Sequence, residues 1–117
     1  MKPPIQVLAK IAEQAHNVNN VWSKEVGNTT RPEWSTLSQD EKEHYIHAVA
    51  NAIDSKLSSP QEAHKQWSTW MLAQGWEYGE AYDKDGKKHP NLRPYDQLPE
   101  TEKVKDILFI AVCKPFY

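Results

Sequence analysis

Apolar residues recur at every third or fourth position in four stretches of the chain, which is the period of one face of an α-helix. The first stripe consists of Leu8, Ile11, Ala12, Ala15, Val18, Trp22 and Val26. Gly27 ends this helix, and the spacing of Ser38 and Glu41 predicts a capping box at the start of the second. The stripe of the second helix consists of Ile46, Val49, Ala50, Ile53 and Leu57.

The third helix has clear start and stop signals. Ser59 predicts its cap, Pro60 suits the first helical position, and Glu62 completes a second capping box. Gly75 predicts its end, because glycine readily adopts the left-handed conformation found just beyond a helix. The apolar stripe of this helix consists of Ala63, Trp67, Trp70 and Met71.

The chain beyond Gly75 predicts a short hairpin and a fourth helix. Aromatic residues alternate over 76–82, which indicates a strand, and Asp85-Gly86 predicts a two-residue hairpin turn. The stretch 89–95 is expected to be extended because its two prolines disfavour helix in the residues before them. The fourth helix begins near Pro99, and its expected buried stripe consists of Val104, Ile107, Leu108 and Ala111.

An internal repeat underlies this layout. Residues 15–27 and 63–75 share the pattern A-H-x5-W-x4-G at an offset of 48, and LSQDEK (37–42) and LPETEK (98–103) match at an offset of 61. The offsets differ by 61 − 48 = 13 residues, so one half carries an insert that the other lacks. Chance similarity between amphipathic helices is the alternative.

The repeat predicts a single domain over 1–117 that is mainly α with a small β-hairpin. Its halves are expected at about 5–57 and 60–113, as two helix pairs related by a pseudo-twofold axis, with the hairpin insert at about 76–95. This arrangement follows from the motif order and spacing, which both recur.

Composition and charge argue against several classes of function. A net charge of −2 argues against binding to DNA or RNA, which needs a basic excess. The longest apolar run, 107–113, is too short to span a bilayer, and the first ten residues lack the apolar stretch of a signal peptide. Cys113 is the one cysteine, so no intrachain disulfide forms. We therefore expect a cytoplasmic protein that does not enter membranes.

Four segments carry a resemblance to a known family. In order they read HKQW (64–67), GWEYG (75–79), HPNLRPY (89–95) and LPETEK (98–103). Together they resemble the ryanodine-receptor repeat (RyR) domain over about residues 60–112. The first half, with PEW at 32–34, is similar to the free-standing forms of this domain in bacteria and their phages.

The resemblance implies a non-catalytic binding module without a cofactor. Channel members of the family bind adenine nucleotides with the base against tryptophan, so the expected partner is an adenine-containing nucleotide, ADP-ribose-like or a cyclic nucleotide signal. In a phage, such a protein would act in the host cytoplasm as a sponge that sequesters an immune signal. Docking of a partner protein on the aromatic surface is the alternative, followed by a nucleotide-degrading enzyme.

The resemblance also assigns candidate ligand-binding residues. It places Trp67 against the base and His64 one helical turn before it, in contact with the ligand. Asp106 stands where the channel repeats carry an asparagine that faces the base. A core position for Trp67 and a hydrogen bond from His64 to a loop carbonyl are the structural alternatives, and His16 repeats His64 in the other half.

Further candidates come from the residues of the insert. Arg93, Lys88 and His89 suit phosphate, Arg93 best because its planar guanidinium can grip two oxygens. Tyr78 and Tyr95 are expected to form a rigid aromatic wall. The alternatives are a solvated charged turn and a small satellite core.

The repeat leaves one face of the base without a partner. The counterpart of Trp67 at the offset of 48 is Asn19, so this chain lacks a second equivalent tryptophan. Trp34, Trp76 or a second subunit would have to cover the opposite face, which makes a homodimer an open alternative. His44 and His47 lack a further ligand that would complete a metal site, and no phosphate loop or hydrolase motif is present.

Overall fold

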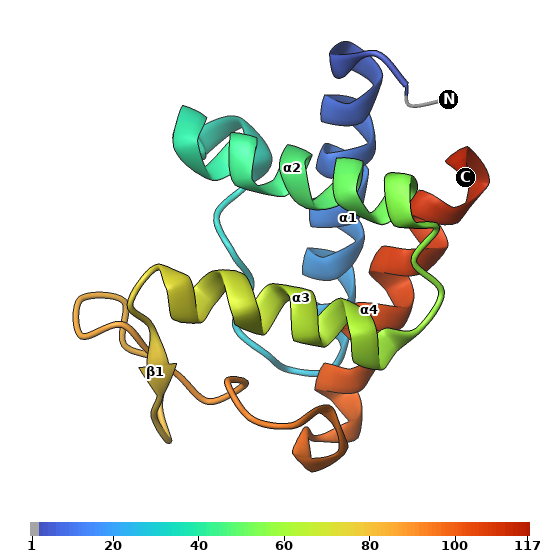
Figure 1. Ribbon diagram of the computed structural model, residues 1–117. Coiled ribbons are helices and arrows are strands. Elements are labelled where there is room, and N and C mark those ends of the chain that lie inside the picture. Colours follow the sequence, from blue (N-terminus) through green and yellow to red (C-terminus); the bar gives the residue numbers. More distant parts are fainter. Residues whose placement is uncertain (1–2) are drawn as a thin grey trace.

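Four α-helices make up most of residues 3–117, the part of the chain described by the computed structural model (Figure 1). They are α1 (Ile5–Glu25), α2 (Gln39–Ser55), α3 (Pro60–Ala73) and α4 (Glu100–Cys113). Three 3-10 helices lie in the connections or at the end: η1 (Trp34–Thr36), η2 (Tyr95–Gln97) and η3 (Lys114–Phe116). The prediction of a mainly helical domain is confirmed.

The helix ends form where the local sequence placed them. The Ser38 hydroxyl accepts from the Glu41 N–H at 3.2 Å, and the Glu41 carboxylate accepts from the Ser38 N–H at 3.4 Å, so the first capping box is complete. Ser59 accepts in the same way from the Glu62 N–H at 3.2 Å, but the Glu62 carboxylate does not return a bond to the Ser59 N–H, so only half of the second predicted box forms. Gly27 and Gly75 end α1 and α3 with φ of +77° and +91°, a region open to glycine.

The core lies where α1 meets α2 and α4. Figure 1 shows α2 and α3 crossing the view, with α1 passing behind α2, and α3 also packs against α4. The buried apolar cluster consists of Leu8, Ile11, Ala12, Val49, Ala50, Ala52, Ile53, Leu57, Ala63, Ile110 and Cys113. The predicted stripes of the first two helices supply most of it.

The predicted buried face of α4 is wrong. Ile107 is 49% exposed and Ala111 is exposed, whereas Ile110 and Cys113 are buried. The stretch 107–113 is apolar all round, so its periodicity does not distinguish one face from another. Contacts of α4 with α1 and α3 determine that the face with residues 110 and 113 is the buried one.

The predicted two-residue hairpin turn is also wrong. The two short strands, β1 (Glu77–Tyr78) and β2 (Lys88–His89), pair in parallel. One antiparallel bridge joins Asp83 and Lys88, with N–H to carbonyl distances of 2.9 Å in both directions, and it encloses four residues, 84–87. The left-handed residue of this loop is Lys87, at φ +54°, instead of the central pair that a type I′ turn requires.

Side-chain contacts explain the longer loop. The Asp83 carboxylate accepts from the Gly86 N–H at 3.1 Å, and Lys87 Nζ donates to the Gln74 carbonyl at 2.7 Å. Lys87 therefore closes the loop onto the end of α3, and the insert extends from that end at the lower left of Figure 1.

Local features recur at the offset seen in the sequence. η1 and η2 start 61 residues apart, and each is followed by a buried leucine, Leu37 and Leu98. The twofold relation of the complete halves stays a prediction.

Candidate functional site

An open groove of about 450 Å³ runs along one face of α3. The α3 wall consists of Gln61, His64, Lys65, Ser68 and Leu72, which are spaced by one, three or four residues and so share a helix face. The segment 92–96, which leads into and begins η2, forms the other wall. Three of the predicted ligand-binding residues, His64, Arg93 and Tyr95, line this groove.

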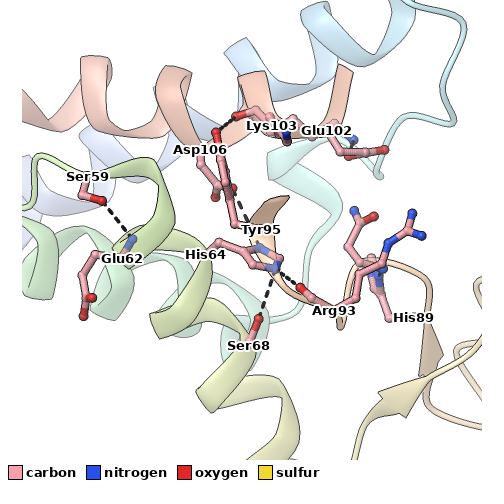
Figure 2. Close-up of polar contacts among 12 residues, drawn as sticks. Ser59, Glu62, His64, Ser68, His89, Arg93, Tyr95, Glu102, Lys103 and Asp106 are labelled. Carbon is pink, nitrogen blue, oxygen red and sulfur yellow. Dashed lines mark hydrogen bonds and ion pairs between the residues drawn. The ribbon is translucent and has the colours of Figure 1, made fainter. Parts of the chain in front are cut away.

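His64 joins the two walls. Its side chain is buried, at 6% exposure, and Nε2 lies 2.8 Å from the Arg93 carbonyl and 3.4 Å from Ser68 Oγ (Figure 2). A carbonyl oxygen only accepts, so the imidazole must carry a proton on Nε2 and donate it to Arg93. The Nδ1 side of the ring then faces Asp106, whose Oδ2 lies 3.9 Å away.

Asp106 lies on the Nδ1 side of the His64 ring and is largely buried. Its side chain is 20% exposed. Burial, and next the charge of Glu102, raise the pKa of the Asp106 carboxyl from 3.8 to about 7, against the opposing effect of Lys105. Near neutral pH this carboxyl is protonated in a large fraction of molecules.

Tyr95 gives the groove its aromatic wall. Its ring meets the His64 ring edge-on at a centroid distance of 6.0 Å, and its hydroxyl donates to the Lys103 carbonyl at 3.3 Å. Burial and the nearby Asp106 raise the pKa of the phenol, so it stays protonated at physiological pH. The hydroxyl is therefore held by α4, and the ring is positioned beside His64.

Trp67 lies next to the groove and does not line it. The indole is half-buried, stacks on His64 at 5.5 Å with the planes 28° apart, and meets His89 edge-on at 4.9 Å. One face of the indole is thus covered by a side chain of its own domain. The aromatic surface that lines the groove is Tyr95.

Arg93 contributes its backbone to the groove. Figure 2 shows its carbonyl facing His64 while the guanidinium points the other way, toward the side of His89. Its Nε is buried and has no hydrogen-bond partner among residues 3–117. Phosphate contact by this guanidinium, expected from the sequence, would therefore occur outside the His64 groove.

His89 is the centre of a satellite aromatic cluster. Its buried ring meets Trp67, Trp76 and Tyr82 edge-on at 4.9, 6.2 and 5.4 Å. Nδ1 accepts from the Asn91 N–H at 3.1 Å. Burial, followed by the charge of Arg31, lowers the pKa of His89 to about 4, so the ring is neutral and holds the insert on α3.

Three other predicted residues lie away from the groove. Lys88 forms an ion pair with Glu77 across the two strands. Tyr78 is 49% exposed on the insert. Trp34 belongs to the other half, where its ring meets His16 at 5.9 Å.

The first half contains a closed counterpart of this site. His16 Nε2 donates to the Pro32 carbonyl at 2.7 Å, as His64 does to Arg93. The ring of Tyr45, 61 residues before Asp106, lies 5.4 Å from His16. Beside it is a cavity of about 80 Å³, lined in part by Asn19. A nucleotide does not fit in that volume, so of these two sites only the groove beside His64 has ligand size.

Sequence reasoning missed much of the groove. Lys65, Ser68 and Leu72 were not singled out, although their spacing from His64 places them on the same helix face. Leu92 and Asp96 carry no comparable signal, because only the path of the chain after β2 brings them opposite α3.

The family model of the RyR domain matches residues 51–111, more than half of the 117-residue chain. The chain therefore belongs to the RyR domain family. The matched region contains both walls of the groove, His64 and Asp106.

No helix within residues 3–117 is long and apolar enough to cross a bilayer. Nor do three histidine, cysteine or acidic side chains gather in that range as metal ligands would.

Proposed function

We propose that this RyR domain binds an adenine-containing nucleotide, ADP-ribose-like or cyclic, without converting it. The observation that carries the proposal is the open groove of about 450 Å³ between α3 and segment 92–96. Sites for small molecules typically have volumes of about 300–1,000 Å³ and combine apolar walls with a few polar groups. Here the polar groups include Lys65 and the buried His64, and Tyr95 adds an aromatic ring.

The hydrogen bonds of His64 support binding without catalysis. Ser68, His64 and Asp106 follow the order of a hydrolase triad, with 3.4 Å from Ser68 Oγ to Nε2 and 3.9 Å from Nδ1 to Asp106. In a triad, Nε2 must accept the proton of the serine. Here Nε2 already donates to the Arg93 carbonyl at 2.8 Å, so it has no free lone pair with which to activate Ser68.

The resemblance to free-standing phage forms extends the proposal to biology. We propose that the chain sequesters a nucleotide signal of host immunity. A sponge of this kind returns its ligand with unchanged mass after heat denaturation, whereas an enzyme returns a product. Mass spectrometry of the released ligand distinguishes the two.

Paired histidine variants test the binding site. His64→Ala and His16→Ala each remove a buried imidazole and leave one loop carbonyl without its donor, so each should lower the free energy of unfolding by about 1–3 kcal/mol. Calorimetric titration with cyclic AMP and ADP-ribose, at a temperature where both variants are folded, should show loss of binding for His64→Ala only. Equal affinity in the two variants would place any ligand outside the groove.

A ligand should also stabilise the wild-type fold. At a ligand concentration of 100 times Kd, the free energy of unfolding should rise by about 2.7 kcal/mol, as urea titration would measure. Tyr95→Leu should reduce this gain more than Trp67→Leu if the ligand lies in the groove. The reverse order would favour the tryptophan contact expected from the family.

The exposed aromatic residues of the insert favour a second candidate, a surface that docks another protein. Tyr78 and Tyr82 are 49% and 54% exposed. This alternative expects no stabilisation by any nucleotide and a protein partner whose binding is lost in Tyr78→Ala.

A further inference from the structure

The walls of the groove combine apolar and charged side chains. The Arg93 carbonyl and the Tyr95 ring both contact His64, which holds segment 92–96 against α3 (Figure 2). Each wall carries one leucine, Leu72 on α3 and Leu92 on the segment. Each wall also carries one exposed charged side chain, Lys65 on α3 and Asp96 on the segment.

The charges along the groove nearly cancel. Lys65 and Asp96 contribute +1 and −1. The guanidinium of Arg93 points away from His64 (Figure 2). Asp106 lies behind His64, 3.9 Å from Nδ1, and does not line the groove.

We infer that this groove selects a nucleotide with a single negative charge, a cyclic phosphodiester in preference to a diphosphate or triphosphate. The inference rests on the proposed function and names its ligand class. The single anionic oxygen pairs with Lys65, the free sugar hydroxyl donates to Asp96, and the uncharged base covers Leu72 and Leu92. Each further negative charge would lose water without gaining a cation and would approach the Asp96 carboxylate.

A charge series with the full-length chain tests the inference. Calorimetric titration at pH 7 with cyclic AMP, AMP, ADP, ADP-ribose and ATP should show affinity that falls at least about tenfold from cyclic AMP to ATP. Asp96→Asn should narrow that difference, because it removes the repelling carboxylate. Lys65→Glu should abolish binding of cyclic AMP, whereas Lys84→Glu, the same charge reversal on the exposed loop of the insert, should leave it unchanged.

The outcomes separate the two levels of the proposal. Affinity that rises with ligand charge, or equal effects of Lys65→Glu and Lys84→Glu, would overturn the inference and leave nucleotide binding standing. Failure of every nucleotide in the series to bind would overturn the proposed function, and the inference with it.

Discussion

His64 and His16 show how one residue type closes each half of the domain. Each imidazole is buried and donates Nε2–H to the carbonyl of a loop that precedes a 3-10 helix, at 2.8 Å to Arg93 and 2.7 Å to Pro32. What differs is the residue on the other side of the ring. A carboxyl group, Asp106, faces His64, while an aromatic ring, Tyr45, packs on His16. Only the first arrangement lies beside a groove of ligand size.

Asp106 should make stability fall with rising pH. Its pKa is raised from 3.8 to about 7 on folding, chiefly by burial, so the folded chain holds a proton that the unfolded chain loses at lower pH. The free energy of unfolding therefore declines by on the order of 4 kcal/mol for this group between about pH 4 and pH 7, and levels off above pH 7. The asparagine of Asp106→Asn cannot ionise, so this variant should not show that decline. The free energy of unfolding of the variant minus that of the wild type, measured by urea titration, should therefore rise from pH 4 to pH 7.

Other groups must be held constant in this comparison. Burial is the main cause that lowers the pKa values of His44 and His89 to about 4. The contribution of these two residues to the free energy of unfolding therefore increases as the pH rises toward 6.5. Both remain in the variant, so their effect cancels in the difference. Asp96→Asn, at an exposed carboxylate, is the matched control. Parallel pH profiles for wild type and Asp106→Asn would show that Asp106 does not retain a proton.

The helices differ in how far their ends and buried faces depend on residues nearby in the sequence. The start of α2 depends on side chains within one turn, and the capping box predicted there forms in full. The end of α2 has no glycine, and Lys56 takes the left-handed conformation at φ +50° instead. α4 has its boundary at Pro99 as expected, but the face it buries is decided by α1 and α3.

Ser38→Ala tests the capping box. Loss of the hydroxyl removes the acceptor for the Glu41 N–H and should lower the free energy of unfolding by about 1 kcal/mol. Ser58→Ala, at an exposed serine that caps no helix, should change it by less than about 0.5 kcal/mol. Chemical denaturation monitored by circular dichroism measures both. Equal losses would mean that the box contributes no more than a surface hydroxyl.

The packed domain buries its one cysteine where the helices converge. Cys113 is 0% exposed in the apolar cluster, and burial raises the pKa of its thiol to about 12. The C-terminal Tyr117 covers the same region, and its hydroxyl donates to the Leu57 carbonyl at the end of α2. The last residues of the chain are thus part of the fold.

Thiol labelling should report opening of the core. Reaction of Cys113 with a disulfide reagent at pH 8 should be at least about a hundredfold slower in the folded than in the unfolded chain. Its rate should rise with urea over the range in which circular dichroism reports unfolding. Ser58→Cys combined with Cys113→Ala supplies an exposed thiol that reacts at once. Fast labelling of Cys113 without urea would show that the end of α4 opens separately from the rest.

Much of the candidate site could be anticipated, but not its arrangement. Four of the residues predicted to bind the ligand meet around one imidazole: His64 itself, Arg93, Tyr95 and Asp106. The Arg93 carbonyl had no signal in the sequence, because every residue carries one. Its role depends on the path of segment 92–96 opposite α3, about 29 residues after His64 in the chain.

The amino-acid sequence alone determined the helical class, the helix starts, the glycine ends and the family, because these depend on neighbours within about one turn or on motif order. Tertiary structure decided which face α4 buries, how the insert loops back, and that Tyr95 lines the groove while Trp67 packs beside it. Such outcomes depend on contacts between residues far apart in the chain. An apolar or aromatic side chain can satisfy several of these contacts equally well, so its type does not reveal its partner.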